Sequence, residues 1–123
     1  MVSATDQGHY QVQGAATINA EQAKALLAQG VAVFEMRHSR HWRAGHPAWA
    51  SFAQRDIGEF TAANLEKLFK KDQAVAFYCG GFTCRMSALA SAKAVIWGYK
   101  NIYDFAGGIP EWVKAGYPLV TDD

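Results

Sequence analysis

The segment Phe77–Ser91, with the sequence FYCGGFTCRMSALAS, contains both cysteines of the chain, Cys79 and Cys84. The apolar run AVAFYC leads into it, and the pattern SALASAKAVIWGY, rich in small residues at helical spacing, follows. A short apolar run of this kind is typical of a strand buried in a parallel sheet. The segment therefore predicts a buried strand, a loop that holds both thiols, and a helix.

The same succession of strand and helix patterns continues on both sides of this segment. Two further apolar runs, VAVFE (31–35) and NIYDF (101–105), predict buried strands. Helices are predicted within the stretches 17–30, 59–71 and 107–116. Residues 36–57 are predicted to be irregular. Strands that alternate with helices indicate an α/β fold with a mostly parallel sheet covered on both faces.

Two of the predicted helices have recognisable signals. In the stretch 17–30, Asn19 is a good N-cap, Gln22 has the spacing of a capping box and Gly30 suits the position after the helix. Its predicted buried residues are Ala23, Leu26 and Leu27. In the stretch 59–71 the residues predicted to share one face are Leu65, Leu68 and Phe69.

Length and charge limit the classes of function. The chain has 123 residues, and we expect a loose arm with one short strand at 1–14 and a single domain at 15–123. The formal charge of +1 gives no broad field for nucleic acid or an anionic membrane, so neither is an expected partner. The N-terminus lacks a secretory pattern. We expect a cytoplasmic protein if Met1 is native, and a periplasmic one if a signal peptide has been removed.

The loop after the 74–79 strand has the composition of an anion-binding cradle. In parallel sheets, ligands bind beyond the carboxyl ends of the strands, and Cys79 lies at such an end. Gly80 and Gly81 allow backbone N–H groups to turn toward a ligand, which would stabilise the thiolate of Cys79. Arg85 adds a cation with forked donors. The alternative is that Cys79 is a small buried hydrophobe.

These features resemble a known family. Over roughly residues 15–120 the chain resembles the single-domain rhodaneses, which are sulfurtransferases. The segments that carry the resemblance are, in order, VFEMR, GHP, YCGGFTCRMS, GYKNIYDFAGGIPEW and AGYPL. Gly107, Gly108 and Trp112 have the family spacing. The resemblance implies a three-layer α/β/α sandwich around a five-stranded parallel sheet.

The active loop is longer than is usual in that family. Cys79, Gly81, Cys84 and Ser87 fit a Cys-x-Gly-x-x-Cys-x-x-Ser signature that resembles a bacterial rhodanese-like subgroup. Elsewhere PAWA follows Gly-His where the family has Ile-Pro-Gly-Ala. The supporting pair expected from the family's Asp-x-Arg element is Glu35 and Arg37.

The resemblance implies sulfur transfer through a persulfide on Cys79, with no cofactor and no metal. The expected partners are a small anionic sulfur donor of the thiosulfate type and a thiol or protein as sulfur acceptor. Donor binding is expected from the remaining loop residues, which are Gly80, Gly81, Phe82, Thr83, Cys84 and Arg85.

Two other functions remain open. The Cys-x5-Arg spacing of Cys79 and Arg85 is also that of cell-division-cycle dual-specificity phosphatases, which share the fold and need a general acid. The loop has no carboxylate; an acid would have to come from elsewhere, and the candidates are Glu35, Asp56 and Glu59. The third function is a non-enzymatic redox-sensing or binding module that uses Cys79 and Cys84.

Cys84 has two interpretations. It is either a packed thiol at the start of the helix, or a resolving cysteine that forms a disulfide with Cys79 or relays its persulfide. Side chains of a cradle loop tend to point apart, so contact between the two sulfurs is not assured.

Histidines and tryptophans gather between the first two predicted strands. The spacing of His38, His41 and His46 fits no familiar zinc pattern, and a structural hydrogen bond is the simpler expectation for His46. Arg40 and Arg43 are expected at the surface, where they would attract an anionic donor. The tryptophans expected in the core or in a pocket wall are Trp42, Trp49 and Trp112.

Overall fold

The computed structural model describes residues 2–4, 10–48, 50–81 and 84–121. Among them the strands and helices are β1 (Val2–Ala4), β2 (Tyr10–Val12), β3 (Ala15–Thr17), α1 (Ala20–Ala28), β4 (Ala32–Glu35), α2 (Ser39–Ala44), β5 (Ser51–Phe52), α3 (Ala53–Asp56), α4 (Ala62–Glu66), β6 (Ala74–Tyr78), α5 (Met86–Ile96), β7 (Asn101–Phe105) and α6 (Gly108–Lys114). None of the helices in this part of the chain is long and apolar enough to cross a membrane.

A five-stranded parallel sheet with the order β3-β7-β6-β4-β5 forms the centre of the molecule. β6, which precedes the cysteine loop, is its middle strand. It pairs with β4 on one side, where Tyr78 lies opposite Glu35, and with β7 on the other, where Phe77 lies opposite Asp104. The predicted strands at 31–35, 74–79 and 101–105 and the parallel sheet are confirmed.

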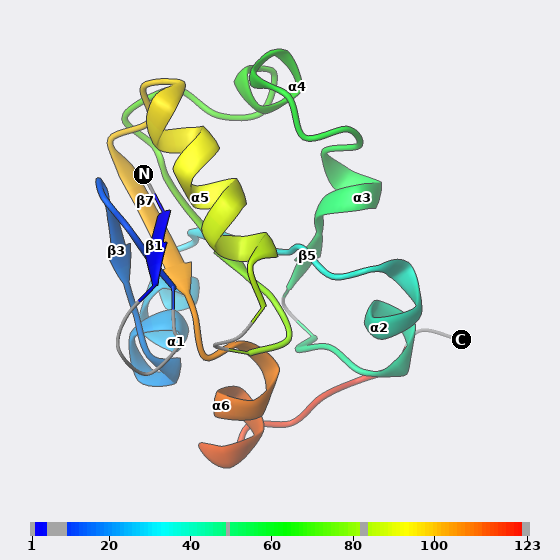
Figure 1. Cartoon of the computed structure of the whole chain (residues 1–123). Helices are drawn as coiled ribbons and strands as arrows, with labels where there is room; N and C mark the ends of the chain where they lie inside the picture. Colours follow the sequence, from blue (N-terminus) through cyan, green and yellow to red (C-terminus); the bar gives the residue numbers. More distant parts are fainter. Residues whose placement is uncertain (1, 5–9, 49, 82–83, 122–123) are drawn as a thin grey trace.

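Helices cover both faces of this sheet, as the resemblance implied (Figure 1). Alternate residues of β6 enter different hydrophobic clusters, because successive side chains of a strand point to opposite faces. Phe77 packs with residues of α3, α4 and α5, whereas Ala76 and Tyr78 pack with residues of α1 and α6. The three-layer α/β/α sandwich is therefore confirmed.

The helix predicted within residues 17–30 begins and ends where its signals indicated. Asn19 caps α1 and forms a complete capping box with Gln22, at 2.9 Å for each hydrogen bond. Gly30 follows with a φ of 84°, the left-handed conformation that glycine accepts without strain. Ala23 is fully buried, and Leu26 and Leu27 pack against the same cluster while partly exposed.

Three local predictions are wrong. Residues 36–57 contain α2, β5 and α3, which are too short to produce a clear periodic pattern. The helical part of 59–71 is limited to α4, so Leu68 lies beyond it and is 46% exposed instead of sharing a buried face with Leu65. The N-terminal arm contains two antiparallel strands, β1 and β2, instead of one.

α6 begins in close contact with the backbone of the cysteine loop. Gly108 has a φ of 53°, and a Cβ atom at this position would fall on the carbonyl oxygen of Cys79 and lie 3.0 Å from the amide nitrogen of Gly81. The amide of Ile109 donates to that same carbonyl at 3.4 Å. Only a glycine lets α6 approach the loop this closely.

We expect Gly108→Ala to destabilise the protein by about 3 kcal/mol or more, because it adds backbone strain and a clash with backbone atoms. Gly116→Ala is the matched control, since Gly116 has a φ of 88° and no atom lies within 4 Å of the position that an alanine methyl group would occupy. The control should lose only about 1 kcal/mol. Urea unfolding measures both values, and equal losses would contradict the close approach.

A buried carboxyl group lies where α5 packs on β7. Asp104 is 1% exposed, and its Oδ1 atom has no hydrogen-bond partner among the described residues. Burial raises the pKa of Asp104 from 3.8 to about 6, although a hydrogen bond with Ser87 acts in the opposite direction. Ser87 stands at the first turn of α5, so this carboxyl group lies beneath the start of the helix that follows the loop.

Asp104 should make stability fall as the pH rises. Between about pH 4 and pH 6 the folded carboxyl keeps a proton that the unfolded one has released, so ionisation costs up to ~3 kcal/mol of folding free energy. Asp104→Asn should remove this loss. The free energy of unfolding of both proteins is measured in urea at about pH 4 and pH 7. The difference between wild type and variant at each pH isolates Asp104, because the other titrating groups contribute equally to both proteins. An unchanged difference across this range would contradict the assignment.

Candidate active site at the carboxyl end of β6

Cys79 is the first residue after β6 and lies at the base of the loop that joins this strand to α5. Only 2% of Cys79 is exposed. Its carbonyl accepts the Ile109 amide, so α6 holds the backbone of this residue from the opposite side. The prediction that Cys79 ends a central strand is confirmed, and this end of the sheet is where ligands bind in parallel α/β proteins.

A disulfide joins Cys79 to Cys84. Their Cα atoms are 6.1 Å apart, which lies in the usual range for disulfides. The sequence left open whether the two sulfurs would touch, and the structure shows that the loop brings them together. Cys84 is partly exposed, so it forms the outer member of the pair and Cys79 the inner one.

Both cysteines border one cavity of about 330 Å³. Its lining residues in the described part of the chain are Arg37, His41, Cys79, Gly80, Cys84 and Met86. They include the Arg37 cation and sulfur atoms but no carboxylate. The cavity therefore offers a thiol site with positive charge beside it.

Arg37 is held in the cavity wall by a buried carboxylate. Its Nη2 atom donates to Glu35 Oε1 at 2.7 Å and to the carbonyl of Gly45 at 2.8 Å. The Cδ atom of Arg37 would lie 3.7 Å from a Cβ atom on Gly80, so the side chain runs along the loop. Its Nε atom has no hydrogen-bond partner among the described residues. The Nε atom itself is buried.

Tyr78 completes the support of this arginine. Its hydroxyl group donates to Glu35 Oε1 at 2.7 Å, and Glu35 is fully buried. Burial, followed by the charge of Glu35, raises the pKa of Tyr78 far above its ordinary value, so the hydroxyl keeps its proton and remains a donor. Glu35 and Arg37 thus lie together, as expected for a supporting pair, and Tyr78 is a third member that sequence reasoning missed. The sequence holds no signal for this role, because the register that places Tyr78 opposite Glu35 is seen only in the folded chain.

The other predicted donor-binding residues occupy different places. Gly80 lines the cavity, whereas Gly81 lies toward α6 and Pro110. The Cys84 amide donates to the Gly81 carbonyl at 3.0 Å, which closes a turn in the loop. Phe82 and Thr83 lie outside the described residues.

Arg85 does not border the cavity. It is exposed, and its guanidinium carbon lies 5.7 Å from the centre of the Tyr10 ring. Its role in binding an anionic donor stays a prediction. The arginine that the structure places in the cavity is Arg37.

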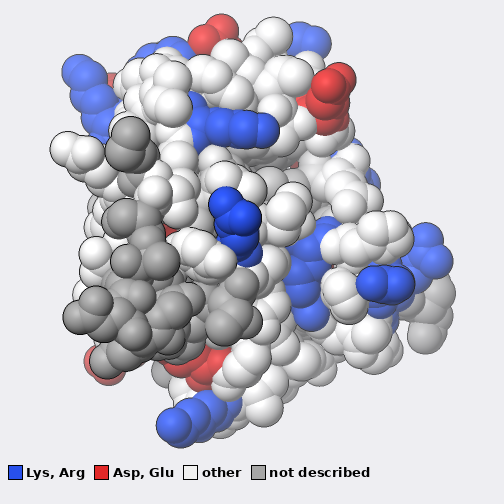
Figure 2. Space-filling view, viewed as in Figure 1, with Lys and Arg blue, Asp and Glu red and all other residues white. Residues whose placement is uncertain are grey.

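Basic side chains gather beside the cavity, over the part of the molecule formed by α2 (Figure 2). This helix supplies Arg40 and Arg43, both exposed, and His41, which reaches the cavity. His41 and Met86 are lining residues that sequence reasoning missed. His41 was missed because the short helix α2 was not predicted, whereas Met86 is the first residue of α5 and directly follows the predicted loop. Positive charge at this entrance favours an anionic ligand.

The remaining histidines of this region have local roles. His38 caps α2 by accepting the Arg40 amide at 3.2 Å, and the His46 ring stacks on Trp42 while its Nδ1 atom lies 2.6 Å from the Trp42 carbonyl. The described residues contain no group of three or more side chains suited to hold a metal ion. The structural hydrogen bond expected of His46 is present.

The candidate general acids do not line the cavity. Glu35 is engaged with Arg37 and Tyr78, and Glu59 is exposed elsewhere. A hydrogen bond with Arg55 lowers the pKa of Asp56, so this carboxyl group is ionised at neutral pH. None of the three is placed to protonate a leaving group beside Cys79.

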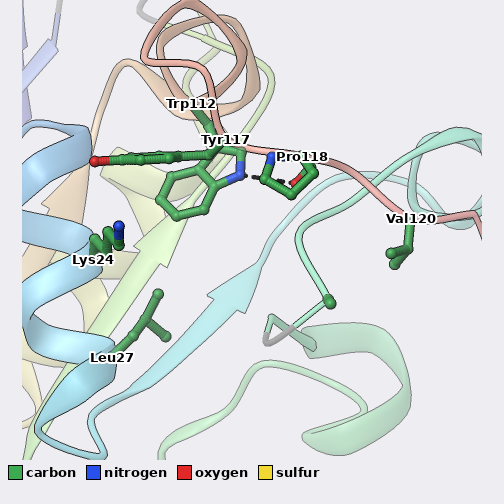
Figure 3. A pocket seen from close by; sticks show the side chains of 7 residues that line it. Lys24, Leu27, Trp112, Tyr117, Pro118 and Val120 are labelled. Atoms are coloured by element: carbon green, nitrogen blue, oxygen red, sulfur yellow. Dashed lines mark hydrogen bonds between the residues drawn. The ribbon is translucent and has the colours of Figure 1, made fainter.

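A second cavity, of about 270 Å³, lies between α1 and the C-terminal segment (Figure 3). Trp112 forms part of its wall and donates from Nε1 to the Pro118 carbonyl at 3.2 Å. Lys24 lies 4.7 Å from the centre of the Tyr117 ring. The described lining residues include no cysteine or histidine, so this cavity lacks the thiol pair that borders the other one. Trp42 and Trp112 are buried as expected, whereas Trp49 lies outside the described residues.

Solved structures with this architecture come from several organisms. A polysulfide-sulfur transferase homodimer from Wolinella succinogenes has a TM-score of 0.66 and 18% identity, over 89% of this chain and 81% of that one. A rhodanese-related protein from Thermoplasma volcanium has a TM-score of 0.65 and 23% identity, over 87% and 99% of the two chains. A Rhodopseudomonas palustris protein of unknown function, described as a "possible tyrosine phosphatase", has a TM-score of 0.63 and 27% identity, over 86% and 85%.

Comparison of the sequence with protein-family models identifies a family, whereas comparison with curated proteins does not. No curated protein matches the chain. The family model described as a rhodanese-like domain matches residues 19–115, which include the strands β4 to β7 of the central sheet and the cysteine loop. The chain therefore belongs to the rhodanese-like domain family.

Proposed function

We propose that the protein is a sulfurtransferase that moves a sulfane sulfur from a thiosulfate-type donor to a thiophilic acceptor. The Cys79 thiolate attacks the outer sulfur of the donor, sulfite leaves with the bonding electron pair, and a persulfide remains on Cys79. An acceptor thiol or protein then removes the outer sulfur. Membership of the rhodanese-like family supports sulfur transfer at the level of the family.

The observation that carries this proposal is the shared cavity of Cys79 and Arg37. Cys79 is nearly buried at its base, and the guanidinium of Arg37 is fixed in its wall by Glu35. The guanidinium of Arg37, which lines the cavity, is the proposed cation for an oxygen of the donor and, later, of the departing sulfite. Fixing the arginine in advance lowers the cost of organising the site during the reaction.

Further donors to the anion are proposed from the loop and from the first turn of α5. The N-terminus of an α-helix carries partial positive charge and free N–H groups, which favour an anion. Backbone N–H groups of Gly80, Gly81 and Arg85 are the proposed loop donors. The Cys84 amide is occupied by the Gly81 carbonyl in the disulfide form. We propose no cofactor and no metal for this reaction.

Sulfite is a good leaving group, which favours sulfur transfer over phosphate-ester hydrolysis at this site. An alkoxide leaving group needs a general acid, and no described carboxylate lines the cavity. Arg85, the residue at the phosphatase spacing, does not line it either. The similarity to the Rhodopseudomonas protein nevertheless makes a Cys-based phosphatase the second candidate, so a phosphate-ester substrate belongs in every assay.

The disulfide supports a third candidate, a non-enzymatic redox-sensing or binding module. In that case Cys79 would be oxidised and reduced without ever carrying a sulfane sulfur. The enzyme and the sensor differ in one observable property, which is turnover of a sulfur donor by the reduced protein.

Reduced Cys79→Ser should form thiocyanate from thiosulfate and cyanide about a thousandfold more slowly than reduced wild-type protein, because the serine hydroxyl cannot hold the sulfur. Cys84→Ser is the matched control and should remain active, since cyanide takes the sulfur directly from Cys79. Thiocyanate is measured by its coloured iron complex, in parallel with hydrolysis of p-nitrophenyl phosphate.

Loss of activity only in Cys84→Ser would move the nucleophile to Cys84. Phosphatase activity without thiocyanate formation would select the second candidate. A wild-type protein inactive in both assays would contradict the enzyme proposals and favour the redox module.

A further inference from the structure

We propose that Cys84 resolves the Cys79 persulfide within the same chain and releases its outer sulfur as hydrosulfide. The inference rests on the proposed sulfur transfer to Cys79 and adds a second reaction to it. With this step the protein reduces a sulfane sulfur without an external acceptor, and the disulfide in the structure is the product.

The geometry determines which sulfur Cys84 attacks. In the structure the Sγ atom of Cys84 is bonded to the Sγ atom of Cys79, which is the inner sulfur of a Cys79 persulfide. With a Cα–Cα distance of 6.1 Å, this contact lies within the ordinary range for a disulfide. Attack on the inner sulfur expels the outer one, whereas attack on the outer sulfur would relay it to Cys84.

The step balances in atoms and electrons. The Cys84 sulfur forms a bond to the Cys79 sulfur, and the bond between the inner and outer sulfurs of the persulfide breaks. The outer sulfur leaves with the bonding pair and becomes hydrosulfide by taking up the proton that Cys84 released when it formed the attacking thiolate. The sulfane sulfur is reduced by two electrons, and the two cysteines are oxidised to the disulfide.

Cys84 is better placed for this attack than a thiol from solution. Cys79 is only 2% exposed, so an external thiol must enter the cavity to reach its sulfur. Cys84 already borders that cavity, five residues along the same chain. A reactant held beside its target reacts at a high effective concentration.

The surroundings of Cys84 favour its reactive form. It lies two residues before α5, an 11-residue helix whose N-terminal positive charge stabilises a nearby thiolate. Arg37 lines the same cavity and adds positive charge. Hydrosulfide is small enough to leave through the opening that admits the donor.

The disulfide then has to be reduced before another cycle. This requires an external dithiol, which attacks Cys84 because it is the more exposed of the two cysteines. Without a dithiol the protein should stop after one turnover. The protein therefore needs a dithiol reductant as a second partner, distinct from the sulfur acceptor of the proposed transfer.

A single-turnover experiment separates the two reactions. Wild-type, Cys84→Ser and Cys79→Ser proteins are reduced, freed of reductant without oxygen, and mixed with thiosulfate alone. Sulfite reports the first step and hydrosulfide the second. Wild type should release one equivalent of each and lose both titratable thiols, whereas Cys84→Ser should release sulfite with hydrosulfide lowered about tenfold or more.

Other results would contradict the inference or the proposed sulfur transfer. Sulfite without hydrosulfide from the wild type would overturn the inference and leave the sulfurtransferase standing. No sulfite from any protein would contradict the sulfurtransferase itself. Equal hydrosulfide from wild type and Cys84→Ser would show that the sulfur leaves without Cys84, which also overturns the inference. Cys79→Ser should release neither product, and dithiothreitol should convert the wild-type burst into continuous release.

Discussion

The position of Cys79 depends on the contact between its backbone and the start of α6. Gly108 has no side chain, so the Cys79 carbonyl lies where a Cβ atom would otherwise be, and the Ile109 amide donates to it. β6 fixes the residue on one side and α6 on the other. Because both are regular elements, Cys79 is held in a defined position beside the cavity.

The positive charge beside Cys79 depends on the ion pair between Glu35 and Arg37. Glu35 is fully buried at the end of β4 and anchors Arg37 in the cavity wall, with Tyr78 as an additional donor. A buried ion pair contributes little net stability, and removing one partner costs about 3–5 kcal/mol because the other charge stays buried. It holds the Arg37 guanidinium in the cavity wall, beside the cysteine pair.

The sequence predicted three strands of the central sheet, the first helix and the position of Cys79 at the end of a strand. The three apolar runs became parallel strands, and the capping box at Asn19 started α1 as predicted. Short elements such as α2 were missed, because six residues produce no periodic pattern. The neighbours of Cys79 in the cavity include Arg37 and His41, which come from a segment far away in sequence, so only the folded chain shows that they border the same cavity.

The intact mass of reduced Cys84→Ser protein after exposure to thiosulfate tests most directly whether Cys79 carries the sulfur. The account predicts that the intact protein gains about 32 Da, the mass of one sulfur atom, and that digestion places this gain on the peptide that contains Cys79. Cyanide should remove it. An unchanged mass, together with a Cys79 that is reduced and accessible to alkylation, would contradict it.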